Sequence, residues 1–115
     1  MIERNLNLNV NPLYGDRIVN VSQGDSFYEM HCAIYDEFKM LDITGATAVV
    51  VGSKPSGTGF NAPCSVVSNT VVFALADSMT EEAGEVELQV VLTEGQEKVS
   101  TNKLTLVVEK EAYNG

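Results

Sequence analysis

Hydrophobic and polar residues alternate along most of this chain, and a period of two is typical of β-strands with one buried face. Near the amino terminus, three apolar residues alternate with asparagines: Leu6, Leu8 and Val10. The alternation is clearest in residues 85–92, where four apolar residues would face one side of a sheet: Val86, Leu88, Val90 and Leu92. No segment has the 3.6-residue repeat of a long amphipathic helix. The pattern therefore predicts an all-β protein.

Turn-forming residues divide the alternating segments into seven or eight short strands. The predicted strands are residues 6–10, 17–22, 27–35, 46–51, 62–67, 70–75, 85–92 and 98–108. One short helical turn is predicted near 78–83, with Ser78 as N-cap, Glu81 at the capping-box position and Gly84 at its end. A chain of 115 residues fits one domain. We therefore predict a single antiparallel β-sandwich that spans residues 1–115.

The charge of the chain limits the partners that it can bind. It carries 16 acidic and 7 basic residues, for a net charge of −9. Binding to nucleic acid or to an anionic membrane surface requires clustered cations, so we expect neither as a partner. No apolar run approaches the ~20 residues of a membrane-spanning helix, and no basic leader precedes an apolar core at the amino terminus. We expect synthesis in the cytoplasm without a signal peptide.

The two cysteines, Cys32 and Cys64, are interpreted as separate buried thiols. Cys32 belongs to the inward-facing set of its strand, together with Tyr28, Met30 and Ile34. Disulfides are rare in a reducing compartment, and no pair of cysteines or histidines has the spacing of zinc ligands. We therefore predict neither a disulfide nor a metal site.

No group of residues in the sequence predicts catalysis. The single histidine, His31, has no nucleophile in a recognisable motif beside it, and a general base needs both a partner and a pocket. The glycine-rich residues 52–59 are similar to a phosphate-binding loop, but Lys54 precedes Pro55 and strand-like residues follow. A hairpin turn is the better interpretation. We predict no catalytic residues, no cofactor and no enzymatic activity.

The order of several short segments resembles the N-terminal domain of phage baseplate upper proteins, the receptor-binding-protein adaptors of siphophage tails. The segments are residues 23–25 (Gln-Gly-Asp), 41–47 (Leu-Asp-Ile-Thr-Gly-Ala-Thr), 54–57 (Lys-Pro-Ser-Gly), 83–86 (Ala-Gly-Glu-Val) and 100–102 (Ser-Thr-Asn). The last of them precedes a strand that ends in Val-Val-Glu. The resemblance covers most of the chain, and it depends on the ordered set because no single segment is specific.

The resemblance implies an immunoglobulin-like β-sandwich with a structural role in a phage or prophage tail. Such a domain docks a fibre or receptor-binding assembly onto the tail hub, and in that family a stem follows it. The implied partners are other tail or baseplate proteins, with a homo-oligomer in the full assembly. The implied location is the virion tail, assembled in the bacterial host cytoplasm. The family has no catalytic residues or cofactor to carry over.

A docking role requires an apolar contact surface. The candidate interface residues are Leu6, Leu8, Val10, Leu13 and Tyr14. Segment 1–14 is accordingly expected to be an exchanged or docking edge strand. The alternative interpretation is that these residues complete the protein's own sandwich.

A second function class is a carbohydrate- or cell-surface-binding module of an adhesin. Sugar binding relies on exposed aromatic side chains, and Tyr14, Tyr35 and Tyr113 are the candidates for exposure. The chain contains no tryptophan, which argues against this class.

Overall fold

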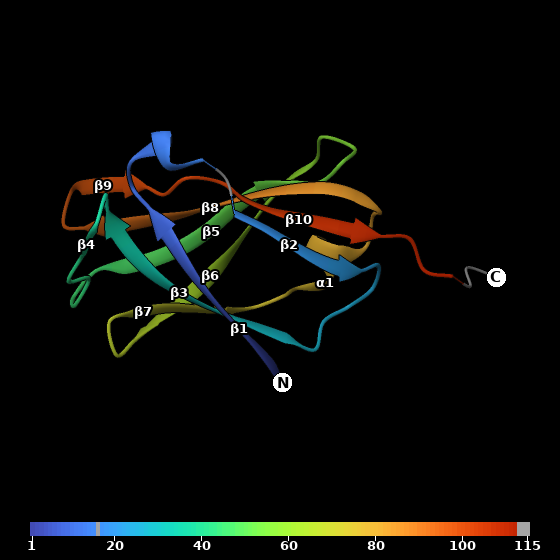
Figure 1. Ribbon diagram of the computed structural model, residues 1–115, viewed down its shortest axis with the longest axis horizontal. Helices are drawn as coiled ribbons and strands as arrows, with labels where there is room; N and C mark the ends of the chain where they lie inside the picture. Colours follow the sequence, from blue (N-terminus) through green and yellow to red (C-terminus); the bar gives the residue numbers. More distant parts are fainter. Residues whose placement is uncertain (16, 113–115) are drawn as a thin grey trace.

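The computed structural model describes residues 1–15 and 17–112 of the chain (Figure 1). Its strands are β1 (Ile2–Asn9), β2 (Arg17–Ser22), β3 (Tyr28–Asp36), β4 (Lys39–Met40), β5 (Thr47–Ser53), β6 (Gly59–Val67), β7 (Thr70–Ala74), β8 (Gly84–Glu94), β9 (Glu97–Ser100) and β10 (Leu104–Glu109). Two short helical turns accompany them, the 3₁₀ turn η1 (Pro12–Tyr14) and α1 (Asp77–Thr80). The protein is nearly all-β, which confirms the predicted class. Among these elements, the sequence pattern missed the two-residue strand β4 and the turn η1, and it merged β9 and β10 into one strand.

The strands form one nearly closed, barrel-like sheet in the order β1-β3-β7-β6-β5-β8-β10-β2. Strand β6 connects the two parts of this sheet, because its residues 59–64 pair with β5 and its residues 65–67 pair with β7. The short strands β4 and β9 pair with β3 and β8. Strands β1 and β2 are the two ends of this order, so each offers an edge without a further partner among the described strands.

Two pairs in the sheet are parallel, and both involve the amino-terminal segment. Strand β1 pairs with β3 in the register Leu6↔Cys32, and β2 pairs with β10 in the register Leu106↔Val19. The chain leaves β1 at one edge, passes through η1 and enters β2 at the other edge (Figure 1). The remaining pairs are antiparallel, as predicted.

The inward-facing positions of the predicted strands form the hydrophobic core. The predicted inward residues of β8 and β10 are all buried: Val86, Leu88, Val90, Leu92, Leu104, Leu106 and Val108. In β3, Met30, Cys32 and Ile34 are also buried, and Tyr28 packs half-buried against the core. Burial of aliphatic side chains is the main driving force for such a fold, at about 1.5–3 kcal/mol for each large side chain.

The prediction of one continuous strand over 98–108 is wrong. Strand β9 ends at Ser100 and β10 begins at Leu104, with the buried residues Thr101 and Asn102 between them. The Thr101 hydroxyl oxygen accepts a hydrogen bond from the Val90 backbone N–H at 3.1 Å, in place of a strand carbonyl. The Asn102 backbone N–H donates to the Asn9 carbonyl oxygen at 2.7 Å. The strand is interrupted because this segment bonds to the end of β1.

The predicted capping of the helical turn is also wrong. The turn α1 covers Asp77–Thr80, its N-cap is Ala76, and no side chain caps it. Instead, Met79 and Thr80 are fully buried, and the Thr80 hydroxyl donates to the Asp25 carbonyl oxygen at 2.7 Å. Packing therefore fixes this turn, and a capping box at Ser78 is not formed.

Gly52, near the end of β5, is a position where the fold excludes any side chain. A methyl group there would overlap the Glu87 carbonyl oxygen and lie 2.8 Å from Leu88 Cδ2 and 2.9 Å from Phe60 Cζ. We expect Gly52→Ala to lower the free energy of unfolding by about 2–3 kcal/mol, because overpacking a rigid site displaces backbone. Urea denaturation followed by circular dichroism measures the change.

The matched control for this prediction is Gly59→Ala at the start of β6. An added methyl group there would lie 3.7 Å from its nearest neighbour, the Gly52 carbonyl oxygen. We expect a change below about 1 kcal/mol. Equal effects of the two substitutions would contradict the close approach of β8 to Gly52.

Candidate docking surface

The five residues predicted as a partner interface lie in two different environments. Leu8 is 1% exposed and belongs to the core, and Leu6 and Val10 are partly buried against it. Leu13 is 90% exposed and Tyr14 is 44% exposed. Leu6, Leu8 and Val10 therefore pack into the protein's own core, which is the alternative interpretation of these three residues. Leu13 and Tyr14 are the part of this set that a partner can reach.

The turn η1 holds Leu13 and Tyr14 outward in a fixed conformation. Asn11 caps it, and its side-chain oxygen accepts a hydrogen bond from the Leu13 backbone N–H at 3.0 Å. Pro12 occupies the first turn, where a missing backbone N–H costs nothing. The turn ends at Gly15, whose φ of +72° favours glycine. The exposed position of Leu13 is thus built into the local sequence.

The turn between β3 and β4 brings a further apolar side chain to the same place. Phe38 is 90% exposed, and its ring lies 5.9 Å from the Tyr14 ring in an edge-to-face arrangement. The preceding residue, Glu37, has a φ of +56°, which is unfavourable for a residue with a side chain. We call Leu13, Tyr14 and Phe38 the apolar tip. Figure 1 shows η1 and the β3–β4 turn at the same end of the molecule.

Asn9 connects the two turns that carry the apolar tip. Its side-chain oxygen accepts hydrogen bonds from the backbone N–H groups of Glu37 at 3.1 Å and Asn11 at 2.9 Å. Its side-chain amide donates to the Glu37 carbonyl oxygen at 2.9 Å. These bonds hold Glu37 in its left-handed conformation and set the position of Phe38. Asn9 itself is 7% exposed, so its polar groups depend on these partners.

Asn102, which lies just before β10, bonds to Asn9 and so connects the end of β1 to the opposite end of the strand order. Its side-chain oxygen accepts from the Asn9 backbone N–H at 3.0 Å, and its backbone N–H donates to the Asn9 carbonyl oxygen. Its side-chain amide donates to the Gly15 carbonyl oxygen. The Arg17 guanidinium also donates to the Asn7 carbonyl oxygen at 3.0 Å, across the two edge strands. Hydrogen bonds from Asn9 and Asn102 therefore fix the turns that carry the apolar tip.

A small hollow lies beside the apolar tip. Its volume is about 300 Å³, and its lining combines aromatic rings with polar side chains. The lining residues are Asn7, Leu8, Asn9, Tyr14, Arg17, Tyr35, Glu37, Phe38 and Asn102.

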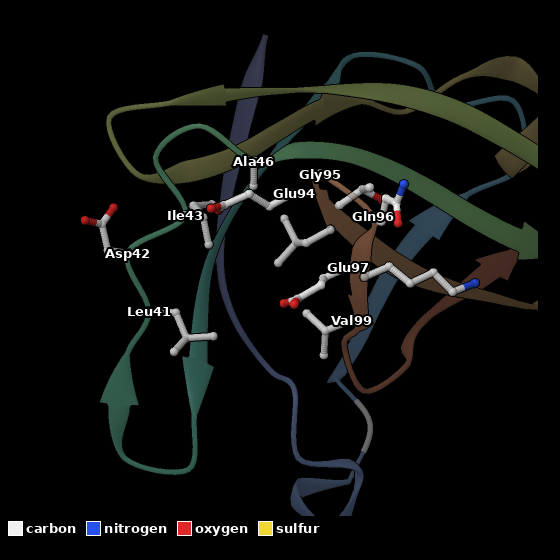
Figure 2. A pocket seen from close by; sticks show the side chains of 12 residues that line it. Leu41, Asp42, Ile43, Ala46, Glu94, Gly95, Gln96, Glu97 and Val99 are labelled. Carbon is white, nitrogen blue, oxygen red and sulfur yellow. The ribbon is translucent and has the colours of Figure 1, made fainter.

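A larger open groove, with a volume of about 670 Å³, lies between the segment 41–46 and the β8–β9 hairpin. Figure 2 shows Leu41 and Ile43 on one side of it and Glu97 and Val99 on the other. Its lining residues are Leu41, Asp42, Ile43, Ala46, Leu92, Thr93, Glu94, Gly95, Gln96, Glu97, Lys98 and Val99. Aliphatic side chains line its walls, and polar or charged residues surround them.

The charges around this groove are mainly negative. Asp42, Glu94 and Glu97 are opposed by Lys98. The Thr44 side chain and backbone hydrogen bond to Asp42 and lower the pKa of that carboxyl group. Asp42 is therefore ionised at neutral pH, and the groove favours cationic groups on anything that approaches it.

The structure places the two cysteine thiols in unreactive surroundings. Burial raises the pKa of the Cys32 thiol to about 12 and that of the Cys64 thiol to about 11, so both are protonated at neutral pH. Both cysteines are free, as predicted. His31 lies half-buried on β3, and its Nε2 is 2.8 Å from a carboxylate oxygen of Glu29.

Two features of the protein surface were not predicted. Phe38 was overlooked, although an aromatic residue within the charged turn Asp36-Glu37-Phe38-Lys39 is a recognisable signal of an exposed apolar contact. The convergence of Glu3, Glu29 and His31 was also overlooked. Among the tyrosines considered for sugar binding, Tyr14 and Tyr35 line the small hollow, and Tyr113 lies outside the described residues.

Comparison with known proteins relates this fold to a phage protein. No protein-family model matches the chain, and no curated protein sequence matches it. Among solved structures, the chain is similar to the N-terminal domain of phage TP901-1 ORF48, with a TM-score of 0.71 and 15% sequence identity. The alignment covers 96% of this chain and 100% of that domain. The similarity at this identity establishes a shared fold. No helix among residues 1–15 and 17–112 is long and apolar enough to cross a membrane.

Proposed function

We propose that this chain is a non-enzymatic structural module of a phage or prophage tail, which docks a fibre or receptor-binding assembly onto the tail hub. Two independent observations support the proposal. The fold is shared with a domain of a phage protein along nearly the whole chain, and the ordered sequence segments resemble phage baseplate upper proteins. The location would then be the virion tail, after synthesis and assembly in the bacterial host cytoplasm.

The apolar tip is the observation that carries the docking role. Leu13 and Phe38 are each 90% exposed, although burying such a side chain contributes about 1.5–3 kcal/mol. Exposed apolar groups gathered at one end of a molecule are typical of interaction sites. The turns below them are held by Asn9, so little conformational entropy is lost when a partner binds. Tyr14, the third residue of the apolar tip, belongs to a residue type that is enriched among the residues that dominate binding energy.

The amino-terminal segment contributes to docking as an edge strand of the domain itself. We propose that residues 1–115 form one immunoglobulin-like domain, in which segment 1–14 supplies an edge strand. The outer edge of β1 has no partner strand among the described residues, but Asn7 and Asn9 already bond there to Arg17 and Asn102. The first half of β1, before Asn7, can therefore accept an added strand from a tail protein. The same edge could pair between copies of this chain, which fits a homo-oligomer in the full assembly.

Co-purification with the tail proteins of the same phage or prophage tests the docking role. The chain would be tagged and expressed together with those proteins, and the complexes would be separated by size-exclusion chromatography with light scattering. We expect one tail-hub protein to elute with the chain in a defined stoichiometry. Elution of the chain apart from every tail protein would contradict the proposal.

The small hollow favours carbohydrate binding as a second candidate function. Tyr14, Tyr35 and Phe38 border it together with polar groups such as Asn7 and Arg17, and sugars bind to aromatic faces that are flanked by hydrogen-bonding groups. A glycan array with the wild-type chain and Tyr35→Ala tests this function. Binding of a defined glycan that Tyr35→Ala abolishes would favour an adhesin-like module over tail docking.

A further inference from the structure

Three side chains that can bind a metal ion converge on one face of the β1–β3 pair. Glu3 comes from β1, and Glu29 and His31 come from β3. The His31 Nε2 atom lies 2.8 Å from Glu29 Oε1 and 3.7 Å from Glu3 Oε1. One possible ligand atom from each residue lies within 4.8 Å of the others. Among residues 1–15 and 17–112, no other group of three such side chains is as close.

The parallel pairing of β1 and β3 produces this arrangement. It aligns Glu3 with Glu29 and Asn5 with His31. Residues 29 and 31 share one face of their strand because side chains alternate along a strand. The three donors are thus held by paired backbone, and only their side-chain rotations are free to adjust.

The charges of the group leave two carboxylates with little compensation. None of the ion pairs among the described residues joins Glu3 or Glu29 to a lysine or an arginine; both pair only with His31. The neighbouring cation, Arg4, lies over the Tyr28 ring at 4.9 Å. A divalent cation between the three side chains would neutralise both carboxylates at once.

The donor set selects the kind of metal. Calcium and magnesium prefer six or more oxygen ligands, whereas one imidazole nitrogen with two carboxylates suits a first-row transition ion. In a tetrahedral site with bonds of about 2.0–2.1 Å, ligand atoms lie about 3.3 Å apart. The two separations at His31, 2.8 and 3.7 Å, lie on either side of that value. We propose that Glu3, Glu29 and His31 form a Zn²⁺-binding site, with water completing the coordination.

A bound ion would tie the edge strand β1 to β3 near the start of the chain. This site lies apart from the apolar tip in the sequence and shares no residue with it. The proposal does not depend on the docking role, and it revises the expectation that the chain has no metal site.

Calorimetric titration of the metal-free chain with ZnCl₂ tests the proposal. We expect one ion per chain, and a melting temperature that rises by about 5 °C when free Zn²⁺ is ten times the dissociation constant. CaCl₂ should leave the melting temperature unchanged. Because the chain has a single histidine, its imidazole signals in a nuclear magnetic resonance spectrum should shift as Zn²⁺ is added.

Substitutions of the ligands locate the ion. Glu3→Gln and His31→Gln should each weaken Zn²⁺ binding at least about tenfold, and Glu3 is exposed, so the first variant should remain folded. Glu94→Gln is the control for an exposed carboxylate elsewhere, and Cys64→Ala is the control for binding to a thiol. Absence of Zn²⁺ binding would overturn the proposal. Binding that survives Glu3→Gln and leaves the His31 signals unmoved would overturn it equally.

Discussion

Removal of residues 1–14 is expected to yield a chain that does not fold at 25 °C. The deletion removes Leu8, which is 1% exposed in the core, and the loss of one such side chain costs about 2–5 kcal/mol. It also removes the strand that covers β3 and the hydrogen bonds from Asn9 to Glu37 and Asn102. Most domains have only about 5–15 kcal/mol of stability in total. Circular dichroism and differential scanning calorimetry should show no cooperative transition.

Asn9→Ala removes the side-chain hydrogen bonds of Asn9 and leaves strand β1 in the chain, so it measures the contribution of those bonds alone. It leaves backbone groups of Glu37 and Asn11 without their partner, so we expect the free energy of unfolding to fall by about 2 kcal/mol. Asn5→Ala, at an exposed position of the same strand, is the control and should change the free energy of unfolding by less than about 0.5 kcal/mol.

The deletion of residues 1–14 has its own contradicting outcome. A deletion variant that unfolds cooperatively near the wild-type temperature would show that segment 1–14 is not part of the core.

Leu13→Ala and Phe38→Ala are each expected to weaken binding to the tail partner by about 30-fold. This estimate corresponds to about 2 kcal/mol for a residue that dominates an interface. Both side chains are 90% exposed in the free chain, so their removal should leave the melting temperature within about 2 °C of the wild-type value. Surface plasmon resonance with the co-purified partner measures the affinity, and scanning calorimetry measures the stability.

Phe27→Ala is the matched control for Phe38→Ala. Phe27 is 64% exposed and lies just before β3, at the opposite end of that strand from Phe38. Its removal should leave the affinity for the partner unchanged. If Phe27→Ala weakened binding as strongly as Phe38→Ala, the apolar tip would not be the contact surface.

The sequence predicted those parts of the fold that depend on local alternation. Val86, Leu88 and Val90 alternate with the polar residues Glu85, Glu87 and Gln89, and Leu92 continues the apolar set, so one face of β8 had to be buried. The turn between β6 and β7 was likewise recognisable from the pair Ser68 and Asn69, both of which adopt positive φ.

The remaining features depend on contacts between distant parts of the chain. Asn9 and Asn102 are 93 positions apart, and nothing in either local segment indicates that they bond to each other. That contact interrupts the strand predicted over 98–108. The parallel pairing of β1 with β3 also has no local signal, so the approach of Glu3 to His31 could not be predicted.

Leu13 and Tyr14 were selected from the sequence as part of an amino-terminal segment that could add to a partner as an edge strand, and the structure leaves both exposed. Leu6, Leu8 and Val10 were selected with them because an edge strand and a core strand have the same alternating pattern. Only the sheet register distinguishes them, because it places Leu8 opposite Ile34 in the core.

Photo-crosslinking from the apolar tip tests the docking claim most directly. A benzophenone amino acid would replace Leu13 in one variant and Thr58, in the exposed turn between β5 and β6, in another. Both variants would be irradiated together with the tail proteins, and the products would be identified by mass spectrometry. Our account predicts a crosslink from position 13 to a tail-hub protein and none from position 58. A crosslink to the hub from position 58 alone would contradict it.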